Sequence, residues 1–188
     1  MKPLLALLLF SHAATGLTLR YWVEPCAQKD ASECHAGDPE LARWALEAWQ
    51  AASDGALHLE LAPKMESAQI RVFWANGRNG LYGEARPIVV DGIHGAEVYV
   101  LPEQSTSDDP LLRDAILYLT CVHETGHALG LQHTAAFADI MYSFQFGGDI
   151  EEYFGRYRRL LNVRADIRKH PGMSDADRKQ LLQAWRQN

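Results

Sequence analysis

The alternation of apolar and polar residues predicts several strands in the first half of the chain. Four short runs have the period-two alternation or the β-rich composition of strands: Leu17–Val23, Leu57–Leu61, Ile70–Trp74 and Ala96–Leu101. No repeat or low-complexity segment interrupts them. These strands are mixed with helical segments, which predicts an α/β (α+β) domain.

Helical periodicity predicts three main helices. Asp38 is expected to cap, and Pro39 to open, a helix that runs through about Ala52. A longer helix begins near Asp109 and Pro110 and ends at about Leu129. Ser174 opens a last helix, with Asp177 as its capping-box partner. The buried stripes of the first two helices come from Leu41, Trp44, Ala45, Ala48 and Trp49, and from Leu112, Ile116, Leu119 and Val122.

The end of the second predicted helix carries the residues of a metal site. His123 and His127 are four residues apart, so they lie on one helix face about one turn from each other and can hold one metal ion. Gly130 is expected to end the helix in the left-handed conformation, which turns His133 back towards the ion. Three histidines plus one open position are typical of catalytic zinc, whereas structural zinc usually has four protein ligands. The sequence therefore predicts one catalytic Zn²⁺.

Glu124 has a different role from the histidines beside it. It lies one position further round the helix, so it is placed to reach a water molecule at the open position of the metal rather than to join the ligands. We expect it to be the catalytic base.

This motif resembles the extended zinc-binding motif of the metzincin metallopeptidases, which is followed by a Met-turn. The segment Asp139–Ser143 follows His133 and is similar to that turn, with Met141 as the methionine. Thr134 stands where adamalysins carry Asp, and Ser143 stands where astacins and serralysins carry a zinc-binding tyrosine. A tyrosine directly after the methionine is typical of matrixins, which the chain resembles most.

The resemblance implies a fold and an activity. The implied fold is a metzincin or zincin-like catalytic domain with a twisted mixed β-sheet, an active-site helix, a Met-turn and a C-terminal helix. The implied activity is that of a zinc-dependent metalloendopeptidase acting on protein or peptide substrates. By the same analogy, residues 83–85 belong either to an edge strand that pairs with extended substrate or to a simple loop.

The chain also departs from the matrixin pattern. Only His94 lies where matrixins carry the histidines of a second, structural zinc. Asp91, Glu97 and nearby carbonyls offer oxygen ligands for Ca²⁺, but no loop has calcium-ligand spacing, and a polar turn is favoured. Residues 147–170 are longer than the family connection, and their apolar residues follow a helix stripe interrupted by Gly155. We expect this segment to pack beside the primed side of the substrate cleft.

The N-terminal residues and the cysteines indicate export. Residues 1–16 have one Lys, an apolar run and then small residues, which is the layout of a cleaved secretory signal peptide too short to span a bilayer. Residues 17–188 then form a single, secreted catalytic domain, extracellular or periplasmic. Cys26 and Cys34 are expected to form a disulfide there. Cys121 is expected to be a buried free thiol, the alternative being a latency switch that blocks zinc.

The net charge of the chain indicates which classes of partner are not expected. The formal net charge of -6 argues against nucleic acid, because phosphate binding needs a basic face. The basic cluster Arg156, Arg158 and Arg159 is interpreted as a solvated helix face. No membrane partner is expected after signal cleavage, and the oligomeric state is left open.

Two other functions stay open alongside endopeptidase activity. One is an inactive, secreted metal-binding or substrate-capturing module on the same scaffold, against which the presence of Glu124 argues. The other is a peptidase restricted to small peptides or cell-wall cross-links.

Overall fold

One five-stranded sheet forms the centre of the protein. In the computed structural model, which describes residues 16–26, 33–76, 82–102 and 107–185, the strand order is β2-β1-β3-β5-β4. All neighbouring strands are parallel except β4 and β5, which are antiparallel. The strands are β1 (Leu17–Val23), β2 (Leu57–Leu61), β3 (Ile70–Trp74), β4 (Gly83–Val90) and β5 (Ile93–Val100). The sheet is therefore mixed, as predicted.

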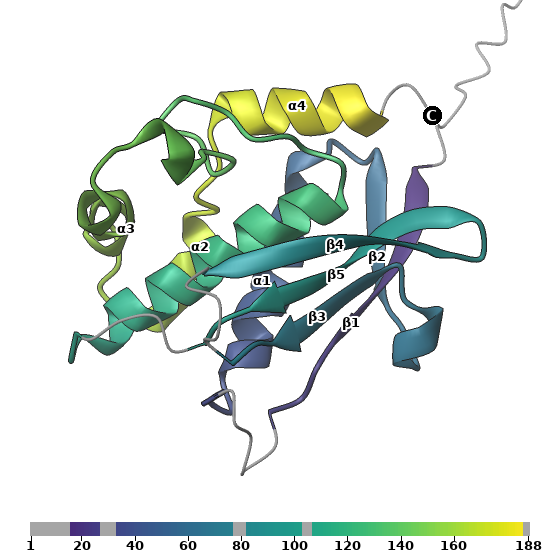
Figure 1. Ribbon diagram of the computed structural model, residues 1–188, viewed down its shortest axis with the longest axis horizontal. Coiled ribbons are helices and arrows are strands. Elements are labelled where there is room, and N and C mark those ends of the chain that lie inside the picture. Colours follow the sequence, from purple (N-terminus) through teal and green to yellow (C-terminus); the bar gives the residue numbers. More distant parts are fainter. Residues whose placement is uncertain (1–15, 27–32, 77–81, 103–106, 186–188) are drawn as a thin grey trace, which may run out of the picture.

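Helices α1 and α2 cover one face of this sheet, while α3 and α4 lie further out (Figure 1). The bounds of the helices are α1 (Asp38–Ala52), α2 (Pro110–Ala128), α3 (Ile150–Arg158) and α4 (Asp175–Trp185), and the 3-10 segments are η1 (Met65–Ser67), η2 (Phe144–Phe146) and η3 (Arg164–Lys169). The α/β architecture expected from the sequence is confirmed.

The core lies between the sheet and the two long helices. Leu19, Val72 and Val98 point from the three central strands into this layer and are fully buried. Trp49 of α1 is also fully buried, and its indole N–H donates to the carbonyl oxygen of Val122 on α2 at 2.9 Å. This contact ties the two helices together directly beneath the predicted metal site.

Two predicted element ends were wrong. Asp38 is the first residue of α1 and does not cap it, since Gly37 occupies the N-cap position. The Asp38 carboxylate is instead buried against Arg113 of α2, with oxygen-to-nitrogen distances of 2.8 and 2.9 Å. Strand β5 begins three residues before the predicted Ala96, because Asp91 and Gly92 adopt positive φ angles of 54° and 79° and form a two-residue hairpin turn with β4.

Strand β4 is an edge strand with one free row of backbone groups. The amide of Leu101 donates to the carbonyl oxygen of Tyr82 at 3.0 Å, and bonded pairs alternate with non-bonded pairs along an antiparallel ladder. The backbone groups of Gly83 and Ala85 therefore point away from β5. Pro87 alternates with these residues along the strand, so its nitrogen also points away from β5, and its missing N–H removes no bond within the sheet. Of the two interpretations of residues 83–85, the edge strand is confirmed.

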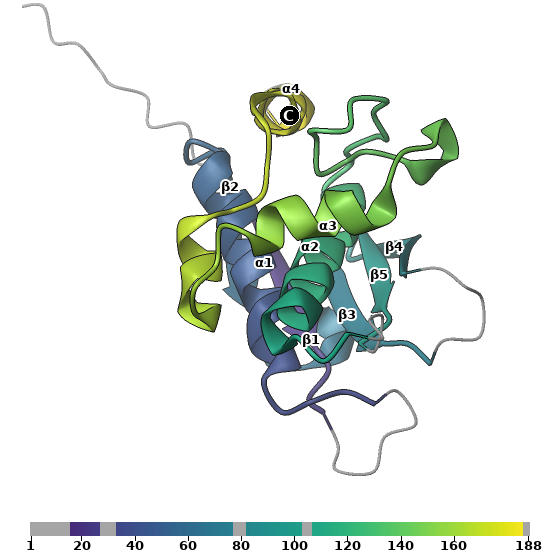
Figure 2. The ribbon, with the colours of Figure 1, turned by 90° about the vertical axis from the view of Figure 1, so that its left-hand side faces the viewer.

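The long segment after the Met-turn contains α3, which packs against α2 (Figure 2). Its basic residues are not simply solvated, as the sequence had suggested. Arg158 bonds the Asp109 carboxylate at 2.7 Å, and Asp109 in turn caps α2. Arg156 lies over the rings of Phe137 and Tyr153. Arg156 and Arg158 therefore fix α3 to its neighbours, whereas Arg159 is exposed, as predicted, and pairs with Glu152 of the same helix.

The cysteines lie as predicted. Cys26 and Cys34 form a disulfide, and Cys121 is a buried free thiol. The predicted signal peptide, apart from Gly16, lies outside the described residues. Within the described part of the chain, no helix has the length and apolar character needed to cross a membrane.

Candidate metal centre

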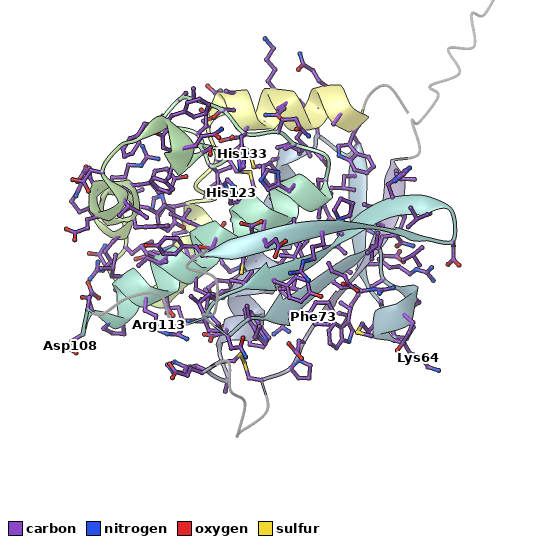
Figure 3. The ribbon with its side chains drawn as sticks, in the orientation of Figure 1. Lys64, Phe73, Asp108, Arg113, His123 and His133 are labelled. Atoms are coloured by element: carbon purple, nitrogen blue, oxygen red, sulfur yellow. A yellow bond between two sulfur atoms is a disulfide. The ribbon has the colours of Figure 1, made fainter. Side chains whose placement is uncertain are left out.

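The end of α2 brings the three predicted histidines together. His123 and His127 lie on one face of α2, and the helix ends in a Schellman motif. In this motif Gly130 has a φ of 89° and donates to the carbonyl oxygen of His127 at 2.9 Å, while Leu131 donates to that of Gly126 at 3.0 Å. The chain therefore reverses directly after the helix, and His133 comes back beside the other two histidines. Figure 3 labels His133 and His123 near each other at this end of α2.

The ring nitrogens of the three histidines converge. The Nε2 atom of His133 lies 3.2 Å from that of His123 and 3.0 Å from that of His127. The Nδ1 atoms of the two helical histidines bond backbone carbonyl oxygens, His123 to Ile140 at 2.7 Å and His127 to Leu131 at 2.9 Å. Because a carbonyl accepts only from an N–H, the Nδ1 atoms carry the protons and the Nε2 lone pairs are free.

This arrangement fits a tetrahedral zinc ion. Ligand nitrogens about 2.0 to 2.1 Å from zinc lie roughly 3.3 Å from one another in a tetrahedron. Burial lowers the pKa of His123 to about 4 and also lowers that of His127, so both imidazoles are in the neutral form that binds metal. Three imidazole donors and no fourth protein ligand among the described residues match a catalytic rather than a structural site.

Met141, the methionine of the Met-turn, packs against α2 at Gly126. Its side chain is fully buried, and a Cβ atom added to Gly126 would lie 2.6 Å from the Met141 sulfur. Gly126 therefore lets the Met-turn approach α2 between the two helical histidines. A glycine inside a helical pattern is a sequence signal for such close packing.

Asp177 of α4 anchors the Met-turn and was not predicted as part of the site. Its fully buried carboxylate accepts from the backbone amides of Ile140 at 2.8 Å and Met141 at 3.2 Å. It also completes the predicted capping box with Ser174. The sequence showed only the local capping role, because the partners in the Met-turn lie more than thirty residues away.

Glu124 is buried beside the histidines. Burial raises the pKa of its carboxyl group to about 8, and the nearby charge of Glu84 acts in the same direction. A divalent cation on the histidines opposes this shift, since an opposite charge favours the carboxylate. Gly83 on β4 leaves room for the side chain, because a Cβ atom there would lie 2.6 Å from Glu124 Cγ.

A cavity of about 460 Å³ opens onto the metal site. The three histidines and Glu124 line one side of it, and the β4 residues Gly83, Glu84 and Ala85 line another. The rest of the lining is largely aromatic, with rings from Tyr82, Tyr142, Phe144, Tyr153 and Phe154. The cavity can therefore hold a large apolar group next to the histidines.

The other residues considered as metal ligands lie elsewhere. Asp91 is paired with Arg20 in the hairpin turn, and Glu97 is paired with Arg71 on the sheet. Among the residues that the structure describes, neither these acids nor His94 belongs to a group of side chains close enough to hold an ion.

The histidine pair on one helix, the glycine turn and the buried methionine together define a metzincin, a class of zinc peptidases. The sequence matches the family described as Matrixin over residues 18–150, more than half of the chain, and the protein belongs to that family. A search of curated proteins gave no significant match. Among solved structures, the chain is similar to archaemetzincin from Methanopyrus kandleri, with 13% identity, a TM-score of 0.48, and coverage of 94% of this chain and 99% of that chain.

Proposed function

We propose that the protein is a secreted, zinc-dependent endopeptidase. The observation that carries this proposal is the convergence of three imidazole nitrogens beside a buried carboxylate, in a cavity that runs along the edge strand β4. His123, His127 and His133 are the metal ligands, and Glu124 is the catalytic base.

The chemistry follows from these roles. A zinc ion on the three histidines supplies Lewis-acid chemistry, which makes a water molecule acidic near neutral pH and polarises the scissile carbonyl. The Glu124 carboxylate accepts the proton of that water during attack and passes it to the leaving amine. Burial raises the pKa of Glu124, which assists the first transfer, because a higher pKa makes the carboxylate a stronger base.

The substrate is an extended peptide with a large apolar side chain. The outward backbone groups of Gly83 and Ala85 can pair with such a peptide as an added strand. The aromatic cavity then accepts the side chain next to the cleaved bond. Tyr153 and Phe154 of α3 form part of its wall, which supports a role for the 147–170 segment in selecting that side chain.

Secretion is supported by the disulfide between Cys26 and Cys34. Disulfides persist in oxidising compartments and are rare in the cytosol. The signal-peptide pattern of residues 1–16 points the same way.

The test is cleavage of a proteome-derived peptide library by the zinc-loaded protein, beside Glu124→Gln and His127→Ala with their zinc contents measured. We expect internal cuts, with large apolar residues enriched on one side of the cleaved bond. Glu124→Gln should keep zinc and lose at least about a thousandfold in kcat/KM, because general base catalysis is removed. His127→Ala should lose both zinc and activity.

The same experiment separates the other candidates. A binding module on this scaffold would hold zinc and cut nothing, and Glu124→Gln would then leave ligand binding unchanged. A peptidase restricted to small peptides would cut only the shortest members of the library. Activity that persists in fully demetallated protein would contradict the proposed chemistry altogether.

A further inference from the structure

Tyr153 on α3 reaches the part of the chain that orients a metal ligand. Its side chain is 4% exposed. The hydroxyl donates to the carbonyl oxygen of Asp139 at 2.9 Å and lies 3.3 Å from that of Ile140. The Ile140 carbonyl oxygen is the same atom that accepts from His123 Nδ1 at 2.7 Å. A chain of hydrogen bonds therefore runs from α3 through the Met-turn to His123.

The ring of Tyr153 is held from several sides. Phe137, Phe144 and Phe154 pack edge-on against it, with ring centroids 5.1 to 5.4 Å away. The guanidinium carbon of Arg156 lies 4.6 Å from its centroid. Burial raises the pKa of the Tyr153 hydroxyl well above its ordinary value, so the group stays a donor. Its position and its proton are both fixed.

The two helical histidines differ in where the carbonyl partners of their Nδ1 atoms come from. The partner of His127 is the Leu131 carbonyl, which the Schellman turn sets locally. The partner of His123 is the Ile140 carbonyl, on a separate loop. Asp177 holds the amide side of that loop through Ile140 and Met141, and Tyr153 holds its carbonyl side. The orientation of His123 thus depends on contacts from distant parts of the chain.

We propose that Tyr153 is a positioning residue for the metal centre, which fixes the Ile140 carbonyl and thereby the ring of His123. Partners of the second ring nitrogen of a metal-binding histidine set its tautomer and orientation, and they tune metal affinity. Tyr153 also lines the cavity, so one side chain contacts both the bound group and the support of the metal ligand. The inference rests on the proposed zinc site.

The test compares Tyr153→Phe with Tyr157→Phe. Tyr157 is a matched control, because it lies on the same helix, is 5% exposed and donates its hydroxyl to the carbonyl oxygen of His170 at 2.6 Å, away from the metal site. Zinc dissociation constants are measured by competition with a chelator, and the absorption spectrum of the Co²⁺-substituted proteins reports ligand geometry. Thermal unfolding of the metal-free proteins gives the purely structural cost of each variant.

Both variants should lower the unfolding temperature to a similar degree. Only Tyr153→Phe should weaken zinc binding, by about fivefold to tenfold, and alter the cobalt spectrum. If Tyr153→Phe does not fold, Arg156→Ala removes the cation over the Tyr153 ring and should weaken zinc about two- to threefold.

Unchanged zinc affinity in Tyr153→Phe, or an equal loss in Tyr157→Phe, would overturn the inference and leave the proposed function intact. Unchanged zinc affinity in Arg156→Ala would likewise overturn the inference and leave the proposed function intact. Wild-type protein that binds no zinc would overturn both.

Discussion

The metal ligands and the residues that support them are encoded in different ways. His123, His127 and His133 lie within one helix and the turn that ends it, so their convergence follows from helix geometry and from Gly130. The supports come from two other elements: Tyr153 on α3 and Asp177 on α4. Local spacing defines which atoms bind the metal, and long-range contacts define how firmly they are held. Loss of a ligand should therefore abolish the site, whereas loss of a support should weaken it by degrees.

Asp177→Ala is the strongest test of that contrast. The substitution leaves the buried amides of Ile140 and Met141 without an acceptor, and each unsatisfied group costs about 1 to 3 kcal/mol. We expect the free energy of unfolding of the metal-free protein to fall by about 3 kcal/mol, measured by urea denaturation. Zinc affinity should fall as well, because the Met-turn carries the carbonyl that orients His123.

Ser174→Ala is the matched control for Asp177. It removes the capping hydroxyl, which accepts from the Asp177 amide and donates to the Asp139 carboxylate at 2.7 Å, but it keeps the bonds from the Ile140 and Met141 amides to Asp177. We expect a cost of about 2 kcal/mol and unchanged zinc affinity, because the two amides keep their acceptor. An equal loss of zinc affinity in the two variants would mean that these amide bonds do not support the metal ligands.

The free energy of unfolding of the metal-free protein should also depend on pH, with a smaller effect. Burial raises the pKa of Glu124 to about 8 in the folded state, so between its ordinary value of 4.5 and about 8 the folded protein binds a proton that the unfolded chain releases. Stability from this group therefore falls as pH rises through that range. Below about pH 6.5 the lowered pKa of His123 acts in the opposite direction. The clear window is pH 6.5 to 8, with an expected loss of about 2 kcal/mol.

Urea denaturation at several pH values checks this, with Glu124→Gln as the comparison. The variant has no group that titrates at this position, so its stability should be nearly constant from pH 6.5 to 8. Parallel curves for the two proteins would show that Glu124 does not hold a raised pKa.

The elements that the sequence predicted well are those whose signals are local. The bounds of β1, β2 and β3 are as predicted, and α2 begins at Pro110, where the sequence placed its start. The full length of β4 was missed because it is an edge strand whose residues are mostly half-buried or exposed, so no apolar alternation marks it. The Asp91-Gly92 pair was a usable hairpin signal that would have placed the start of β5.

The candidate site divides in the same way. The ligand set, Glu124 and Met141 followed from spacing and from resemblance; the structure brings the histidines and Glu124 together and packs Met141 against Gly126 of the same helix. The roles of Tyr153 and Asp177 at the Met-turn could not be predicted. The local sequence does not distinguish a buried tyrosine from one that bonds a distant carbonyl, or a capping aspartate from one that also binds distant amides. Such contacts depend on how α3 and α4 pack, which the sequence pattern does not determine.

Gly83→Ala should have the smallest effect and should separate catalysis from metal binding. The added methyl group would lie 2.6 Å from Glu124 Cγ and 2.8 Å from Oε1, so the carboxylate has to move. Misplacing a catalytic group by about 1 Å costs up to a hundredfold in rate. Because the Glu124 side chain can adjust partly by rotation, we expect kcat to fall about tenfold. Zinc affinity should stay the same, since the three atoms nearest the new methyl group all belong to Glu124 and none to a ligand.

Gly155→Ala is the control for this last substitution. It adds a methyl group within α3, where the nearest atom is the flexible guanidinium end of Arg159 at 3.5 Å, so nothing has to move. Alanine also favours the helix more than glycine does. If Gly83→Ala and Gly155→Ala have the same kcat, β4 leaves more room around Glu124 than its backbone position implies. If Gly83→Ala also loses zinc, the strand edge supports the ligands as well as the base, and the contrast between ligands and supports extends to β4.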